Sequence, residues 1–482
     1  MTETTAAQPD TGSLADRIAA GWETAVMPTL TEYITIPNVS PAFDRDWEPN
    51  GYMEAAVVLV RDWLAARPVT GLTVDVQRLP GRTPLIVAEV AASDPTLSER
   101  TVLLYGHLDK QPEMTGWRDG LGPWTPVVDG DRLYGRGGAD DGYAAFASML
   151  AVEAAQAAGI PHARLLLLVE ASEESGSDDL PAHIDRLAER IGTPELVVCL
   201  DSGCLDTERL WVTTSLRGMA AVALTVEVLT SGVHSGGASG IVPSSFRIIR
   251  QLLDRVEDAV TGQVLLPELH VEIPVERITA AHDTADALTR SPADEMPFAG
   301  TTQPMSSDAA QQYIARTWEP TLSYISADGL PPTSRAGNVL RPATTVGLSF
   351  RLPPTCDHEA ALAAVTATLL ADPPSGATVR VVGNSAPGWN APPIAPWLAV
   401  ALDAASTAAF GQPARTFGEG GTIPFIGMLG ERFPDAQFVV TGVLGPGSNA
   451  HGPDEFLHLP MARGVTECIA RLLGAHAVSP AP

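Results

Sequence analysis

The feature that most limits what this chain can form is a short apolar run that ends in two neighbouring carboxylates. Residues 164–169 contain four consecutive leucines and have the length of a strand buried on both faces. Glu173 and Glu174 follow side by side a few residues later. Like charges this close raise each other's pKa unless cations share the site. The sequence therefore predicts a buried strand whose end carries a cation site.

Further strands and helices alternate around this run. The apolar segments predict strands over 101–105, 164–169 and 196–200, and the segments between them predict helices over 143–158 and 179–191. A further helix is expected over 13–36, where Ser13 and Asp16 resemble a helix cap. Continuous apolar strands separated by helices indicate an α/β fold with a largely parallel sheet covered on both faces.

Polar residues follow several of these strands. His107, Glu173, Glu174 and Asp201 all come just after a predicted strand end. In open α/β sheets, ligands bind beyond the carboxyl ends of the strands. The shared position predicts that these side chains meet in one site.

The pattern changes after Arg217. Alternating strands over 220–230 and 344–351, with helices over 244–256 and 358–370, predict an inserted α+β unit. The earlier pattern resumes with a helix over 395–410, a strand over 437–441 and a last helix over 460–473. We therefore expect residues 1–216 and 389–482 to form two parts of one domain, and residues 217–388 to form the inserted domain.

Composition excludes several classes of partner. A net charge of −27 without a basic cluster repels nucleic acid and anionic membranes. No apolar run reaches the roughly 20 residues that cross a bilayer, and the chain does not start like a signal peptide. Four cysteines without paired spacing are read as small buried residues. We expect a soluble protein located in the cytoplasm.

Each candidate motif is weak when taken alone. His107-x-Asp109 can be structural, Asp201 can cap a helix, and His451 can be an exposed loop residue. The glycine-rich turn 135–142 ends in negatively charged residues, which argues against a phosphate-binding loop. Asp140 in this turn could instead bind a cation. Capping of the following helix is an equally good explanation of this aspartate. Together, two imidazoles and several carboxylates at strand-to-loop junctions suit a pair of divalent ions such as zinc or manganese.

In their order along the chain, these motifs resemble a known family. It comprises dinuclear zinc peptidases and amidohydrolases, including carnosine dipeptidase, carboxypeptidase G, aminoacylase and succinyl-diaminopimelate desuccinylase. The resemblance runs from about residue 13 to 473 and is closest to the dipeptidase branch. It is carried by His107-x-Asp109, Gly135-Arg136-Gly137 with Asp140, Glu173-Glu174, Asp201, His234-Ser235-Gly236 and His451.

The resemblance implies a role for each of these residues. It implies that Asp140 bridges two divalent ions, zinc first, with manganese or cobalt as alternatives. One ion would also be held by His107 and Asp201, and the other by Glu174 and His451. A hydroxide between the ions would be the nucleophile, with Glu173 as general base and Asp109 as the partner of His107. The peptide bond after Asp140 would be cis. Spacing alone leaves the roles of Glu173 and Glu174 interchangeable.

It also implies a substrate-binding set, most of it in the inserted domain. His234 would stabilise the oxyanion in the partner's site of a homodimer formed through this lid and dimerisation domain. Arg351 matches an arginine that binds the substrate carboxylate, with a structural salt bridge as the rival reading. Thr422 and Asn338 match positions near the substrate.

The expected function is hydrolysis of short peptides, most of all dipeptides, that have a free C-terminal carboxylate. The long insertion, about residues 217–388, resembles the dipeptidase branch. The alternatives are an N-acyl-amino-acid amidohydrolase on the same metal site and a non-catalytic metal-dependent binding protein. Gly142-Tyr143 stands where this family commonly has Lys-Gly, which leaves the exact substrate open.

Overall fold

The computed structural model describes residues 12–480, which divide into two compact units. The first contains the residues up to 213 together with 391–416 and those from 428 onward, and the second contains 214–390 and 417–427. The sequence pattern placed all of 389–482 in the first domain, but segment 417–427 groups with the second unit. Hydrogen bonds explain the difference: Arg217 Nε donates to the Gly420 carbonyl, and Thr422 Oγ1 donates to the Arg217 carbonyl.

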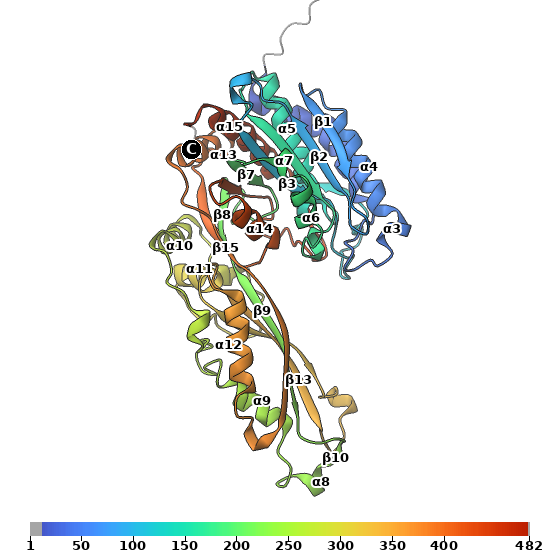
Figure 1. Ribbon diagram of the computed structural model, residues 1–482, viewed down its shortest axis with the longest axis vertical. Coiled ribbons are helices and arrows are strands. Elements are labelled where there is room, and N and C mark those ends of the chain that lie inside the picture. Colours follow the sequence, from blue (N-terminus) through green and yellow to red (C-terminus); the bar gives the residue numbers. More distant parts are fainter. Residues whose placement is uncertain (1–11, 481–482) are drawn as a thin grey trace, which may run out of the picture. The chain divides into compact units, whose positions relative to one another are not determined.

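A mixed sheet forms the centre of the first unit (Figure 1). Its four middle strands are parallel, and antiparallel strands flank them on both sides. In spatial order the strands are β1 (Leu72–Gln77), β2 (Leu85–Val90), β6 (Arg164–Glu170), β3 (Thr101–His107), β7 (Leu196–Cys199), β17 (Gln437–Val440), β8 (Trp211–Leu216) and β15 (Trp389–Asn390), and β16 (Arg415–Glu419) also pairs with β8. The α/β fold class is confirmed, with the parallel pairing confined to the middle of the sheet.

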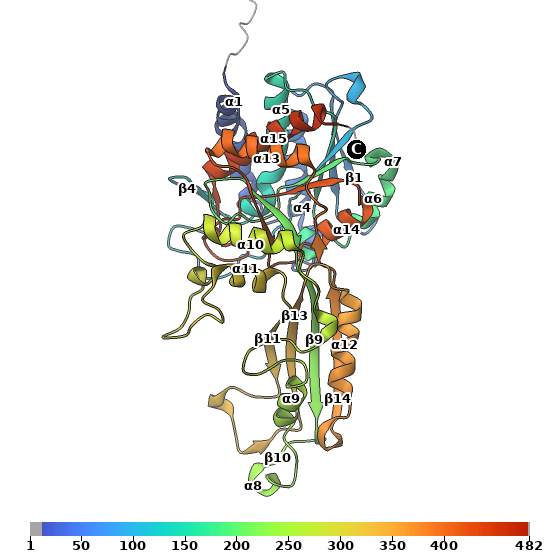
Figure 2. The same ribbon diagram turned by 90° about the vertical axis from the view of Figure 1, so that its left-hand side faces the viewer.

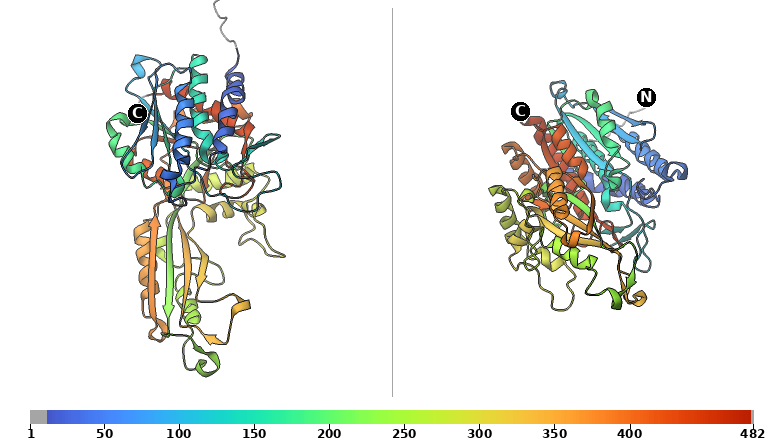
Figure 3. Two further views of the ribbon diagram at one scale, coloured as in Figure 1. Left: turned by 90° about the vertical axis from the view of Figure 1, so that its right-hand side faces the viewer. Right: turned by 60° about the horizontal axis from the view of Figure 1, so that its bottom comes forward.

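Helices cover both faces of this sheet, as the continuous apolar strands predict. Short helices lie on one side, and the longer helices lie on the other (Figures 2 and 3). The short helices include α6 (Leu180–Arg186) and α7 (Ala188–Ile191), and the longer ones include α1 (Leu14–Gly21), α2 (Met27–Ile34), α4 (Tyr52–Ala65), α5 (Tyr143–Ala157), α13 (Pro396–Phe410) and α15 (Leu459–Val478). Every residue of β3 and β7 is buried, which accounts for their apolar sequences.

Two predicted helices are each divided in the structure. The segment 13–36 forms α1 and α2 joined by the π-helical residues Trp22–Val26, and Ser13 with Asp16 forms the expected capping box. The segment 179–191 forms α6 and α7 instead of one helix. The first unit also contains a small sheet of β4 (Val127–Asp129), β5 (Arg132–Tyr134) and β18 (Phe456–His458).

The second unit is built on a four-stranded antiparallel sheet (Figure 2). Alternate residues of β9, from Ala220 to Val226, are buried against helices on one face, as the alternating sequence predicts. The strands in order are β11 (Thr321–Asp328), β13 (Ala343–Leu352), β9 (Gly218–Glu227) and β14 (Thr378–Ala386), and the packed helices are α9 (Ser245–Leu253) and α12 (His358–Leu370).

Shorter elements complete the second unit. They are β10 (Val233–His234), which pairs with β12 (Val339–Leu340), β15 (Trp389–Asn390), and helices α8 (Ser235–Ala238), α10 (Val275–Ala287) and α11 (Ala309–Thr317). Within the described part of the chain, no helix has the length and apolar character that crossing a bilayer requires.

Candidate metal centre

Three neighbouring parallel strands bring the first group of polar residues together. His107 is the last residue of β3, Asp201 follows the end of β7, and Glu173 and Glu174 lie in the turn after β6. Since β6, β3 and β7 are adjacent and parallel, their carboxyl ends meet at one edge of the sheet. The site therefore follows from the strand order.

Asp140 lies between two groups of side chains in this site. Its Oδ1 is 3.4 Å from His107 Nε2, and its Oδ2 is 2.9 Å from His451 Nε2. Asp201 Oδ2 is 3.8 Å from His107 Nε2, and Glu174 Oε2 is 3.2 Å from His451 Nε2. The result is two potential ligand sets, His107-Asp140-Asp201 and Asp140-Glu174-His451, that share one carboxylate.

The turn that carries Asp140 needs its glycines. Gly137 has φ of 75°, and a Cβ there would lie 2.6 Å from Lys110 Cγ. A Cβ at Gly142 would lie 2.2 Å from the Tyr33 ring, so this close approach also requires glycine. The Asp140–Asp141 peptide bond is cis, as the resemblance implies.

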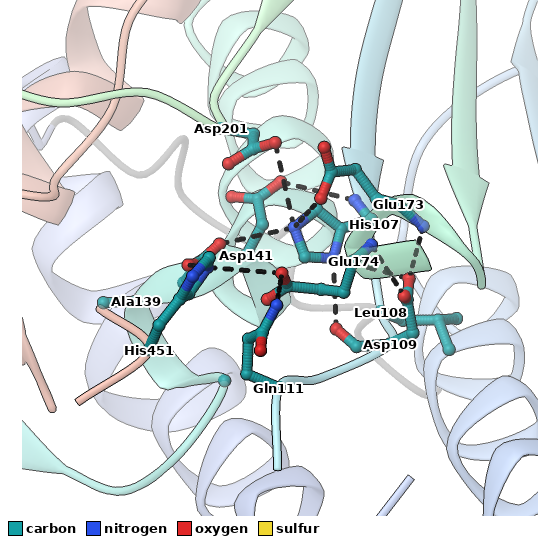
Figure 4. A network of polar contacts seen from close by, with 12 residues as sticks. His107, Leu108, Asp109, Gln111, Ala139, Asp141, Glu173, Glu174, Asp201 and His451 are labelled. Carbon is teal, nitrogen blue, oxygen red and sulfur yellow. Dashed lines mark hydrogen bonds and ion pairs between the residues drawn. The ribbon is translucent and has the colours of Figure 1, made fainter. Parts of the chain in front are cut away.

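Asp109 contacts His107 differently from a simple carboxylate–imidazole pair. The backbone carbonyl of Asp109 lies 3.1 Å from His107 Nδ1, whereas its carboxylate oxygen is 3.6 Å away. That carboxylate accepts the backbone N–H groups of Glu173 and Glu174, both at 3.0 Å. Asp109 thus orients the imidazole through its main chain and holds the Glu173-Glu174 turn through its side chain (Figure 4).

The side chains of the site carry more negative charge than they balance among themselves. Burial raises the pKa of Asp201 to about 7, and burial together with Asp201 raises the pKa of Glu173. Burial opposes ionisation of Asp140 too, but the contacts with His107 and His451 hold its pKa well below the ordinary value. Contacts with Asp140 and Glu174 overcome burial and raise the pKa of His451 to about 11. In the absence of other cations, these carboxylates compete for protons.

One buried nitrogen tests whether the residues fit a metal ion. His107 Nε2 is buried and has no hydrogen-bond partner. Because Nδ1 faces the Asp109 carbonyl and can donate to it, the neutral ring directs the Nε2 lone pair toward the carboxylates of Asp140 and Asp201. A lone pair that faces two carboxylates is stabilised by a cation in front of it, either a proton on Nε2 or a metal ion between the groups. The donor set of imidazoles and carboxylates suits divalent ions such as zinc.

A buried ion pair that the sequence analysis did not assign supports the Asp140 turn. The Arg136 guanidinium pairs with the Glu455 carboxylate, and both side chains are at most 1% exposed. Glu455 Oε1 accepts the backbone N–H of Gly137 at 2.9 Å and lies 3.4 Å from that of Asp140. Glu455 follows His451 in the same loop. Its charge within a glycine- and proline-rich segment is the sequence feature that could have identified Glu455 as a functional residue.

The same pair also holds the loop that carries His451. Arg136 Nη2 donates to the Gly452 carbonyl at 2.8 Å. His451 has φ of 64°, a conformation that is uncommon outside glycine and is maintained here by its surroundings. Its side chain is 54% exposed, so this side of the site opens to solvent. Gln111, a third residue without a predicted role, donates to Glu174 Oε2 at 2.6 Å (Figure 4).

The predicted substrate residues all lie in the second unit. His234 and Asn338 are exposed, and His234 Nδ1 accepts the backbone N–H of Gly236 at 3.1 Å. Arg351 and Thr422 are half-buried, and Arg351 Nη1 donates to Thr422 Oγ1 at 3.3 Å. Within the described residues Arg351 has no ion pair with a carboxylate at 4.0 Å or less, which argues against the salt-bridge reading.

Curated proteins with similar sequences are dipeptidases. The chain is 27% identical to cysteinylglycine-S-conjugate dipeptidase of Corynebacterium striatum over 381 residues, which span 76% of this chain and 79% of that enzyme. It is 30% identical to Cys-Gly metallodipeptidase dug1 of Schizosaccharomyces pombe over 283 residues, 57% of this chain and 58% of that enzyme.

Solved structures share the fold over nearly the whole length. The Dug1p dipeptidase of Saccharomyces cerevisiae superposes with a TM-score of 0.76 at 22% identity, covering 97% of this chain and 98% of that chain. Human carnosine dipeptidase 1 superposes with a TM-score of 0.73 at 23% identity, covering 96% and 98%. The sequence model that represents peptidase family M20/M25/M40 matches residues 103–475 of this chain. The predicted resemblance is thus confirmed: the chain belongs to peptidase family M20/M25/M40 and is a metallopeptidase.

Proposed function

We propose that this protein is a dipeptidase that uses two divalent metal ions and acts on short peptides with a free C-terminal carboxylate. The observation that carries the proposal is the position of Asp140, whose two oxygens face His107 and His451 at 3.4 and 2.9 Å. The dipeptidase names of the similar proteins support the choice of substrate class. The proposal retains the cytoplasmic location expected from the sequence.

The metal ligands of the proposal are the two sets that share Asp140. His107 and Asp201 complete one set, and Glu174 and His451 complete the other. Zinc suits these donors, with manganese or cobalt as alternatives. When bound, two such ions lower the pKa of a water molecule and polarise the scissile carbonyl.

Glu173 is the proposed general base. Its Oε2 lies 3.9 Å from His107 Nε2, and its side chain belongs to neither ligand set. Glu174, in contrast, is engaged by His451 and by Gln111 at 3.2 and 2.6 Å. This difference favours Glu174 as ligand and Glu173 as the residue that takes a proton and delivers it to the leaving amine.

Residues of the second unit bind the substrate in this proposal. Arg351 pairs with the C-terminal carboxylate through its guanidinium fork, with Thr422 and Asn338 beside the substrate. His234 stabilises the oxyanion of the partner subunit's substrate in a homodimer formed through the inserted domain. The hydrogen bond that His234 Nδ1 accepts leaves Nε2–H as the donor of the neutral ring, which suits an oxyanion.

One substrate survey tests the proposal. Zinc-loaded and manganese-loaded enzyme is assayed against dipeptides, the matching N-acetyl amino acids and dipeptide amides. We expect dipeptides to be cleaved fastest and the amides, which lack the carboxylate, to react poorly. Faster cleavage of N-acetyl amino acids would assign the chain to amidohydrolases. No cleavage by enzyme with both ions bound would favour a metal-dependent binding protein.

A further inference from the structure

Three arginines, Arg217, Arg316 and Arg351, lie near one another in the second unit. Arg217 is only 8% exposed, and its Nη1 donates to Thr321 Oγ1 at 3.1 Å. Thr321 is the cross-strand neighbour of Arg351 in the β11–β13 pair. A Cβ at Gly420 would lie 3.5 Å from Arg217 Nη2 and 3.1 Å from Arg316 Cγ. The absence of a side chain at Gly420 therefore lets two of these arginines pack close to its backbone.

The positive charge of this cluster is poorly compensated. Within the described residues, neither Arg217 nor Arg351 has a carboxylate oxygen within 4.0 Å, and Arg316 reaches Glu295 only at 4.0 Å. Arg316 Nε is buried and has no hydrogen-bond partner. Burial, followed by the charges of Arg351 and Arg316, lowers the pKa of Arg217 to about 10. The guanidinium groups repel one another, so an anion bound among them would stabilise the cluster.

The partners that hold these arginines are neutral. Arg217 Nε donates to the Gly420 carbonyl at 3.1 Å, and Arg351 Nη1 donates to Thr422 Oγ1 at 3.3 Å. Thr422 in turn donates to the Arg217 carbonyl at 2.6 Å, which ties the two arginines to one loop. These bonds fix the guanidinium groups but leave their charge unbalanced. One substrate carboxylate would neutralise one charge and leave a second.

We propose that Arg217, Arg316 and Arg351 form a site for two carboxylates, so that the preferred substrates are dipeptides ending in aspartate or glutamate. The proposal rests on the dipeptidase function. Arg351 takes the C-terminal carboxylate, and Arg217 and Arg316 take the acidic side chain of the same residue. Guanidinium groups match carboxylates in geometry and charge, and a neutral amide in that position loses the charge-assisted hydrogen bonds.

The test compares acidic dipeptides with their neutral isosteres. The kcat/KM values of Ala-Asp and Ala-Glu are measured against Ala-Asn and Ala-Gln. We expect the wild type to prefer the acidic member of each pair by at least about 10-fold. Arg316→Gln should reduce this preference to below about 3-fold, with kcat/KM falling more on Ala-Asp and Ala-Glu than on Ala-Asn and Ala-Gln, since only the acidic side chain loses a charged partner. Arg217→Lys, which keeps the charge but loses the fork, should retain part of the preference.

Matched variants separate specificity from damage to the fold. Arg247→Gln, an exposed arginine of the same unit, should leave the preference unchanged. Equal rates for acidic and neutral dipeptides in the wild type would overturn the proposal, as would an equal loss on all four substrates in Arg316→Gln. If no dipeptide is cleaved, the dipeptidase function fails, and calorimetry with glutarate decides on the arginine site alone. Binding that Arg316→Gln weakens supports the site, and no binding to the wild type refutes it.

Discussion

The candidate metal centre of the first unit and the predicted substrate residues of the second unit are held in different ways. Around the metal centre, Asp109 braces two backbone N–H groups and Glu455 braces the Asp140 turn, both from buried positions. His234 and Asn338 in the second unit are exposed, and the hydrogen bond that the His234 ring accepts comes from the nearby Gly236 backbone. From this contrast we expect the ion-binding part to be rigid before substrate binds, whereas the proposed contacts of His234 and Asn338 are completed only on binding or assembly.

The largest effect should come from the carboxylate shared by both ligand sets. Asp140→Ala removes an oxygen from each set, so we expect both ions and all activity to be lost. Elemental analysis of the purified variant measures the ions per chain. The exposed Asp119→Ala serves as control and should keep two. Two ions per chain in Asp140→Ala would exclude its bridging role.

The second-largest effect on activity should come from Glu173, whose replacement separates proton transfer from metal binding. Glu173→Gln should bind both ions normally but lose at least about 10³-fold in kcat, because base catalysis typically contributes 10²–10⁴-fold. The exposed Glu113→Gln is the control and should be fully active. Should Glu173→Gln lose an ion while Glu174→Gln keeps both, the two roles would have to be exchanged.

His234 tests whether the exposed residues of the second unit act on a partner's site. His234→Ala should lose about 10²-fold in kcat, comparable to removal of one oxyanion donor. Mixing His234→Ala with Asp140→Ala should restore part of the activity, since one site of each mixed dimer would contain both residues. His282→Ala, another exposed histidine of this unit, should have no effect. Proven mixed dimers without recovered activity would rule out a role in trans.

The smallest effect on turnover should come from the support beneath the metal centre. Glu455→Ala leaves Arg136 buried and unpaired, which should lower the free energy of unfolding by about 3–5 kcal/mol. Metal affinity should fall about 10–100-fold, as for other residues that orient ligands. Arg136→Met with Glu455→Leu should recover stability but not metal affinity. Unchanged affinity in this double variant would mean that the pair only stabilises the fold.

The sequence predicts the residues at the ends of buried strands better than it predicts contacts between distant loops. His107, Asp201 and the Glu173-Glu174 pair were recognisable because each follows a buried apolar strand, and strand order then brings them together. Likewise, helix α12 was predicted over the residues it occupies, 358–370.

Elsewhere the sequence pattern was too weak. Strand β11 was missed because most of its residues are exposed, so it has no alternating apolar face. Glu455 and Arg136 were given no role, because their pairing joins residues 319 positions apart through a loop whose path the sequence does not reveal. The arginine cluster depends on the same kind of long-range contact, between Arg217 and segment 417–427.

The central claim is that two ions share Asp140 at the edge of one sheet. Anomalous diffraction from crystals of the zinc-loaded protein tests it most directly. Two such ions should give two peaks per chain, one among His107, Asp140 and Asp201 and the other among Asp140, Glu174 and His451. A single peak, or peaks that do not share Asp140, would contradict it.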